Sequence, residues 1–265
     1  KSFMENNKKT TLKEFLNNKK QTLRGILVET SSKDLAVVMF GGFERSGTTE
    51  KKFKTLADKL ACSEISSLRF DATDCGLSDG DFYDMTTESL SENLFSAYNF
   101  LLNYSFKKVF FVAHSLAACA LSLLVGKINI EKAILIAPAL NQRELLRLWF
   151  AQKSNKEIKI DWNNYKNYYQ EKEFIDNLNF DLITKCHKLN KEYRLKNHDC
   201  DYSNLFIPIK NSILLIHGDN DNTVPLQSLN IDFTNKIIIK NGDHDLERPG
   251  IIEQWLDKSV SFLKE

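Results

Sequence analysis

The sequence predicts an α/β protein with a mainly parallel sheet that is flanked by helices. Two observations lead to this fold class. Short, continuous apolar runs recur along the chain, and such runs are typical of strands buried on both faces. Between them lie segments whose apolar residues recur every three or four positions, as in helices packed on a sheet. Strands that alternate with helices in this way favour parallel pairing through crossover connections.

The chain is predicted to open with a β-hairpin. Residues 21–29 alternate between apolar and polar side chains, as a half-exposed strand does. Residues 12–16 form a matching strand, and the Asn-Asn-Lys segment 17–19 forms the turn between them. Residues 35–40 follow as a continuous apolar run that ends in two glycines, which indicates a buried strand.

Two amphipathic helices are predicted next. The apolar residues of the first share one face: Phe53, Leu56 and Leu60. A strand over 65–70 and a polar loop over 72–84 separate the two helices. The second helix covers 90–101, and Thr86 or Thr87 is its expected N-cap because hydroxyl side chains satisfy free amides at a helix start.

The second half contains four more apolar runs that predict buried strands: 107–113, 132–137, 212–216 and 236–239. The first of them continues almost directly into a helix of small residues over 119–124. The last predicted helix covers 251–260 and carries an apolar face.

Residues 141–207 interrupt this alternation. The stretch is rich in Lys, Asn and Tyr and contains no predicted strand. We therefore expect a helical cap, or lid, that is inserted over the strand ends. Residues 1–140 and 208–265 then form the α/β core.

Composition excludes several classes of protein. The 36 basic and 35 acidic residues give a formal net charge of +1, so nothing suggests a nucleic-acid partner. The longest apolar run, 109–125, is too short to span a bilayer comfortably, and the polar first residues predict no signal peptide. The five cysteines form no CxxC pair, so we expect no disulfide framework and a reducing, cytoplasmic location.

Ser115 is the strongest functional signal in the sequence. It lies between a predicted buried strand and a predicted helix, where a tight turn exposes the serine at the carboxyl end of the sheet. This arrangement is a nucleophile elbow. Ala113 and Ala117 occupy the two flanking positions where glycine is usual, and they are small enough for the strand and helix to approach.

Serine is a weak nucleophile at neutral pH and needs an adjacent general base. His244 lies in a short loop after the strand 236–239, at the sheet edge that also carries Ser115. Its carboxylate partner is expected in the loop after strand 212–216, which offers Asp219 and Asp221. His114 should point away from the serine, and His217 is interpreted as structural.

A tetrahedral intermediate also requires an oxyanion hole. We expect one donor to be the backbone N–H of Leu116, directly after the nucleophile. The other is expected in the loop after Gly41-Gly42, at the backbone N–H of Phe43.

Taken together and in order, these motifs resemble the α/β-hydrolase superfamily over nearly the whole chain. The similarity lies in the oxyanion, glycine-bearing, acid and histidine loops: 40–43, 69–82, 217–225 and 242–244. Phe40 stands where the family usually has His, and Asp74 where it usually has Gly. The acid-loop pattern favours Asp221 over Asp219. The strand end 137–139 and the cap are most similar to cinnamoyl/feruloyl-esterase-like carboxylesterases.

The resemblance implies a serine hydrolase that cleaves carboxylic esters, with Ser115, His244 and Asp221 as the triad. A thioesterase or acyltransferase with the same triad, or a non-catalytic ligand-binding homologue, remains an alternative. The expected partner is a small-molecule acyl ester or thioester. No cofactor is expected, and no metal, because the segment after Asp219 lacks the glycine and glutamate of a calcium loop. The sequence does not indicate the oligomeric state.

Overall fold

The computed structural model describes residues 8–73, 75–184 and 186–265, so Asp74 lies outside the described residues. Its centre is one eight-stranded sheet. In chain order the strands are β1 (Lys9–Leu16), β2 (Thr22–Glu29), β3 (Leu35–Phe40), β4 (Ser66–Phe70), β5 (Lys108–His114), β6 (Ala133–Ile136), β9 (Ile213–Gly218) and β10 (Asn235–Ile239). Their spatial order is β1-β2-β4-β3-β5-β6-β9-β10.

Most of this sheet is parallel. Neighbouring strands pair in parallel along the spatial series β4-β3-β5-β6-β9-β10. In contrast, β2 runs antiparallel to both of its neighbours, β1 and β4. The predicted mainly parallel sheet is therefore confirmed. All parallel strands point the same way, so the loops after β3, β5, β9 and β10 emerge at one edge of the sheet.

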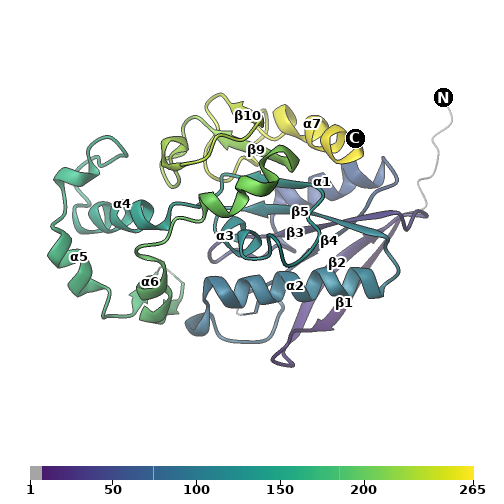
Figure 1. Cartoon of the computed structure of the whole chain (residues 1–265), viewed down its shortest axis with the longest axis horizontal. Coiled ribbons are helices and arrows are strands. Elements are labelled where there is room, and N and C mark those ends of the chain that lie inside the picture. Colours follow the sequence, from purple (N-terminus) through teal and green to yellow (C-terminus); the bar gives the residue numbers. More distant parts are fainter. Residues whose placement is uncertain (1–7, 74, 185) are drawn as a thin grey trace.

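Helices cover both faces of the sheet (Figure 1). The helices α1 (Lys51–Ala61) and α7 (Glu253–Lys264) contact each other on one face, around the fully buried Trp255. The helices α2 (Thr87–Asn103) and α3 (Ala117–Ser122) pack together on the opposite face. Each pair buries an apolar stripe against alternate side chains of the strands, which explains the periodic patterns in the sequence.

The predicted hairpin and helix start are also confirmed. The strands β1 and β2 pair antiparallel, and the Asn17 side chain accepts hydrogen bonds from two backbone amides in the turn. Thr86 is the N-cap of α2 and forms a capping box with Ser89. The last helix differs at its start, because Ile251 and Ile252 lie in a turn before α7 and only their side chains join the apolar core.

The segment between β6 and β9 lies at one end of the sheet, at the left of Figure 1. It comprises α4 (Gln142–Ser154), α5 (Glu171–Asn177), α6 (Lys191–Asn197) and a short antiparallel pair, β7 (Leu182–Ile183) and β8 (Lys188–Leu189). The sequence predicted only helices here. Each of these strands has two residues, which is too short to produce a recognisable alternation. The structure also has short 3₁₀ turns over Phe82–Asp84, Tyr165–Asn167, Ser203–Ser212 and Leu226–Ser228.

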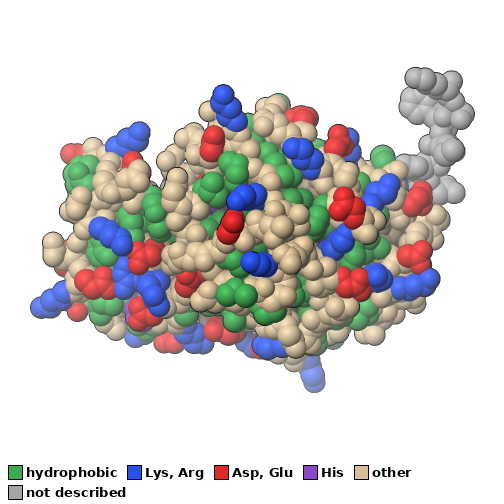
Figure 2. Space-filling model, turned by 45° about the horizontal axis from the view of Figure 1, so that its top comes forward, with side chains coloured by type: hydrophobic (Ala, Val, Ile, Leu, Met, Phe, Trp, Pro, Cys, Tyr) green, Lys and Arg blue, Asp and Glu red, His purple; other side chains and the backbone are tan. Residues whose placement is uncertain are grey.

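The surface carries mixed charge. Figure 2 shows basic and acidic side chains interspersed over one face of the molecule, in keeping with the net charge of +1. Across residues 8–73, 75–184 and 186–265, no helix has the length and apolar character needed to cross a membrane.

Candidate active site

Ser115 follows β5 directly and has a backbone φ of +56°, in the left-handed region that residues with a Cβ rarely adopt. Hydrogen bonds hold it in this conformation. Its amide donates to the Ile136 carbonyl at 2.9 Å, and its own carbonyl accepts from the Ala139 amide at 3.2 Å. Ala113 and Ala117 on either side are completely buried, so small residues do fill the two positions where the turn is most crowded.

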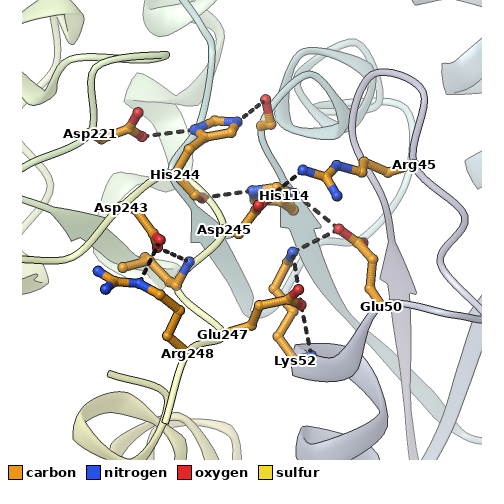
Figure 3. Close-up of polar contacts among 12 residues, drawn as sticks. Arg45, Glu50, Lys52, His114, Asp221, Asp243, His244, Asp245, Glu247 and Arg248 are labelled. Carbon is orange, nitrogen blue, oxygen red and sulfur yellow. Dashed lines mark hydrogen bonds and ion pairs between the residues drawn. The ribbon is translucent and has the colours of Figure 1, made fainter. Parts of the chain in front are cut away.

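His244 lies between Ser115 and the carboxylate of Asp221, and Figure 3 shows the histidine facing that carboxylate. Its Nε2 is 2.9 Å from Ser115 Oγ, and its Nδ1 is 2.8 Å from Asp221 Oδ2. An ionised carboxylate only accepts hydrogen bonds, so Nδ1 carries the proton of the neutral ring. That tautomer leaves the Nε2 lone pair free to accept the serine proton.

The two candidate carboxylates have different partners. The second oxygen of Asp221, Oδ1, accepts from the amides of Thr223 and Val224 at 2.9 and 2.8 Å, which fixes the side chain toward His244. Asp219 instead accepts from the Asn241 amide at 2.6 Å. The structure thus brings Asp221 to the histidine, while Asp219 connects the ends of β9 and β10.

His217 stabilises the acid loop through a hydrogen bond to its backbone. Its Nε2 donates to the Val224 carbonyl at 2.8 Å and lies 3.6 Å from Asp221 Oδ2. The ring is fully buried, and burial lowers the pKa of His217 even though the Asp221 charge acts in the opposite direction. A neutral imidazole that donates to a loop carbonyl agrees with the structural interpretation of this residue.

The loop after β3 lies against Ser115. A Cβ built on Gly42 would lie 2.8 Å from Ser115 Cβ and 3.0 Å from the His114 carbonyl, so only glycine allows this approach. Within the described part of the chain, neither the Phe43 amide nor the Leu116 amide donates a hydrogen bond to a protein acceptor. Both predicted oxyanion donors are therefore available at the sheet edge that carries Ser115.

The segment 141–207 contacts two of these loops. Trp149 in α4 donates from Nε1 to the Thr223 carbonyl at 2.7 Å, next to the acid. The Glu44 carboxylate, directly after Phe43, accepts from the Thr184 hydroxyl and lies 3.0 Å from His187 Nδ1. Sequence analysis gave no sign of these contacts.

Three buried polar residues beside the site were also missed or incompletely described. His114 does turn its ring away from the Ser115 hydroxyl, but its Nε2 lies 3.0 Å from the backbone carbonyl of His244. Glu50 and Lys52 lie next to it. In the sequence, a Glu and a Lys at a helix start are typical of a solvated surface, so no local signal marked them as buried.

Phe40 takes a different role from the histidine that is usual at its position. Its ring stacks on Phe70 with centroids 4.8 Å apart and planes inclined by 8°. Apolar packing therefore fixes the start of the oxyanion loop here. Over residues 8–73, 75–184 and 186–265, no group of three or more His, Cys, Asp or Glu side chains is arranged to hold a metal ion.

Known structures resemble the chain although its sequence does not point to a relative. No protein-family model matches, and no curated protein matches in sequence. The structure of Est1E from Butyrivibrio proteoclasticus with bound ferulic acid matches with a TM-score of 0.74 at 17% identity, over 94% of this chain and 97% of that one. An esterase from Pyrococcus furiosus matches with a TM-score of 0.70 at 15% identity, over 97% and 91%.

The similarity extends to an α/β hydrolase, GrgF, from Penicillium sp., with a TM-score of 0.69 at 17% identity over 97% of this chain and 98% of that one. Each match spans nearly the full length of both chains, including the cap segment. The likeness agrees with the strand order, the antiparallel β2 and the helices on both faces. The chain has the α/β-hydrolase fold.

Proposed function

We propose that the protein is a serine hydrolase that cleaves carboxylic esters. The observation that carries this proposal is the unbroken hydrogen-bond chain from Asp221 through His244 to Ser115, with donor–acceptor distances of 2.8 and 2.9 Å. A fold by itself does not define an activity, but this arrangement of acid, base and nucleophile suits acyl transfer.

In the proposed reaction, Ser115 Oγ attacks the acyl carbon while His244 Nε2 takes its proton. The amides of Phe43 and Leu116 donate to the oxyanion that forms. The intermediate collapses as His244 protonates the departing alcohol, which leaves an acyl-enzyme. Water then attacks this ester with His244 again as the base, and Ser115 is regenerated.

Residues 141–207 are proposed to form a cap over this site, with 1–140 and 208–265 as the core. The contacts of Trp149 with the acid loop and of Thr184 with Glu44 support this division. Ser115 is only 7% exposed, so the cap would control entry of the substrate. The cytoplasmic location remains a proposal that rests on the cysteine content.

A panel of acyl donors would identify the substrate class. A structure that resembles this chain, Est1E, was solved with ferulic acid, so feruloyl esters belong in the panel. Aryl esters of increasing acyl length and acyl thioesters complete it, because the same triad serves esterases, thioesterases and acyltransferases.

The decisive test is reaction with a fluorophosphonate probe, followed by mass spectrometry of the labelled peptide. We expect labelling at Ser115 in the native protein and none in Ser115→Ala. If the folded native protein is not labelled, or if Ser115→Ala keeps ester turnover, the proposal is wrong. Binding of an ester that is recovered unchanged would then favour the non-catalytic alternative.

A further inference from the structure

A buried charge cluster lies directly beside the proposed catalytic histidine (Figure 3). It consists of Glu50, Lys52 and His114, whose side chains are 5%, 0% and 1% exposed. Lys52 Nζ lies 2.7 Å from Glu50 Oε1, and His114 Nδ1 lies 3.6 Å from the same oxygen. None of these side chains touches Ser115 Oγ, so the proposed reaction does not use them directly.

Stability does not account for this cluster. Lys52 lies in the first turn of α1, where the helix dipole disfavours a positive charge. Removing an ion pair from water costs free energy, and replacement of such pairs by apolar residues is often neutral or stabilising. An apolar side chain would therefore serve the fold at least as well at this position. The cluster calls for another explanation.

His114 connects the cluster to the histidine loop. A carbonyl oxygen only accepts hydrogen bonds, so His114 Nε2 must donate to the His244 backbone carbonyl at 3.0 Å. Burial, together with the nearby Lys52 charge, lowers the pKa of His114 to about 4. At neutral pH the ring is thus neutral with its proton on Nε2, as the contact with His244 requires.

Glu50 balances the charge of Lys52 and faces His114. Burial alone would raise the pKa of Glu50, but the adjacent Lys52 ammonium offsets this, and the pKa is lowered. Its other oxygen, Oε2, lies against Gly41, where a Cβ would come within 3.0 Å. The carboxylate thus fits between the oxyanion loop and the histidine loop.

Two further contacts join the histidine loop to the segment before and within α1. Arg45 pairs with Asp245 at 2.7 Å, directly after His244. Glu247 accepts from the Lys52 amide at 3.3 Å, and its carboxylate lies 3.9 Å from Lys52 Nζ. The loop is therefore held through the backbone carbonyl of residue 244 and through the side chains of residues 245 and 247.

We propose that Glu50, Lys52 and His114 are positioning residues, which hold the His244 backbone so that its ring meets Ser115 and Asp221 together. This inference rests on the proposed hydrolase function and deepens it. The Glu50–Lys52 ion pair packs beside the His114 ring, with Glu50 Oε1 3.6 Å from Nδ1, and His114 donates to the His244 carbonyl. Small displacements of a reacting group cost large factors in rate, so loss of this support should appear in turnover before it appears in substrate binding.

The first test replaces the donor. His114→Leu removes the hydrogen bond to His244, and we expect kcat on an aryl ester to fall by about 10- to 100-fold while KM changes by less than about threefold. His114→Gln offers an amide N–H at nearly the position of Nε2. It should restore kcat to within about fivefold of native.

The second test separates positioning from stability. Glu50→Leu combined with Lys52→Met removes both buried charges at once, and the Glu247 carboxylate that loses its contact with Lys52 is 29% exposed to solvent. We expect this double variant to keep or raise the native melting temperature, yet to react with the fluorophosphonate probe about tenfold more slowly. Asn93→Ala is the matched control, because it removes the buried hydrogen bond that Asn93 of α2 donates to Thr73, on the opposite face of the sheet from α1. It should lower the melting temperature without slowing labelling.

Each outcome decides something different. Failure of the native protein to label would overturn the proposed function itself. Native labelling with equal rates in His114→Leu and the double variant, measured per folded molecule, would overturn the positioning role alone. Failure of Gln to restore turnover at position 114 would also contradict it, since the proposed role needs only an N–H donor.

Discussion

At the residue scale, Asp219 and Asp221 lie two positions apart in the sequence but have different hydrogen-bond partners. Both carboxylates follow β9, but only Asp221 reaches His244 Nδ1, because two amides of the following turn hold its other oxygen. Asp219 bonds to the Asn241 backbone instead. The two residues therefore form a natural pair of test and control.

We expect Asp221→Asn to lower kcat on an aryl ester by about 10³- to 10⁴-fold, because an amide cannot hold the same histidine tautomer. Asp219→Asn keeps an acceptor for the Asn241 amide and should leave kcat within about threefold of native. Steady-state kinetics of both variants check this prediction. Equal effects at the two positions would contradict the assignment of the acid.

The low pKa of His114 predicts an acid-sensitive fold. The folded ring titrates at about 4 and the unfolded one at 6.5, so between these pH values the unfolded chain holds a proton that the folded chain lacks. The free energy of unfolding should thus fall as the pH drops from 6.5 to 4, by about 3 kcal/mol in total. The Lys52 charge disfavours protonation of His114 and the Glu50 charge favours it, so both residues influence the pKa of His114.

Urea unfolding at pH 7 and pH 4.5 measures the effect. His114→Gln cannot titrate and serves as the control, so its stability should depend less on pH over this range. Identical pH dependence in the two proteins would show that His114 does not carry the effect.

At the scale of elements, the sheet and its helices were predictable because their signals are local. The apolar run of β3, the capping box of α2 and the alternation in β2 are each written in neighbouring residues. The proposed meeting of Ser115 and His244 at one edge could be predicted from the parallel sheet, since both residues follow parallel strands. Local patterns of this kind decide which residues form each element.

Other features could not be predicted from local patterns. The contact between Glu44 and the β7–β8 pair joins residues about 140 positions apart, and neither segment has a recognisable motif. The burial of Lys52 depends on Glu50, Glu247 and His114 approaching from three separate segments. Such pairings exist only once the chain is folded.

The Glu44 contact predicts that the loop after β3 and the β7–β8 hairpin support each other. Glu44→Ala removes the acceptor of Thr184 and His187, so amide hydrogen exchange over residues 182–189 should be at least about tenfold faster. Exchange in β5 should not change. Lys188→Ala is the control, because it leaves the Glu44 contacts in place and removes an exposed ion pair with Asp181 and a cation–π contact with Tyr83. Equal acceleration in both variants would contradict the support by Glu44.

At the scale of the whole molecule, the proposed cap and core share an apolar cluster. The cluster on the α2 and α3 face includes Phe111 and Leu121 from the core, and also Leu146, Phe174 and Tyr193 from the segment 141–207. No boundary in this cluster separates the two regions. Their stabilities should therefore be coupled.

We expect the protein to unfold in a single thermal transition, in which the calorimetric and van't Hoff enthalpies agree. Scanning calorimetry with near-ultraviolet circular dichroism, which follows Trp149 in the cap and Trp255 in the core, tests this. Two separate transitions would show that residues 141–207 fold as an independent unit.

The left-handed backbone of Ser115 has a consequence for the stability of the whole chain. A side chain at φ +56° costs about 1–2 kcal/mol, and that cost persists in every folded copy whether or not substrate is present. Ser115→Gly should therefore melt about 2–4 °C above Ser115→Ala, although both lack the hydroxyl. A glycine here would avoid that cost, so the chain keeps its serine at a loss of stability that the proposed role as nucleophile would explain.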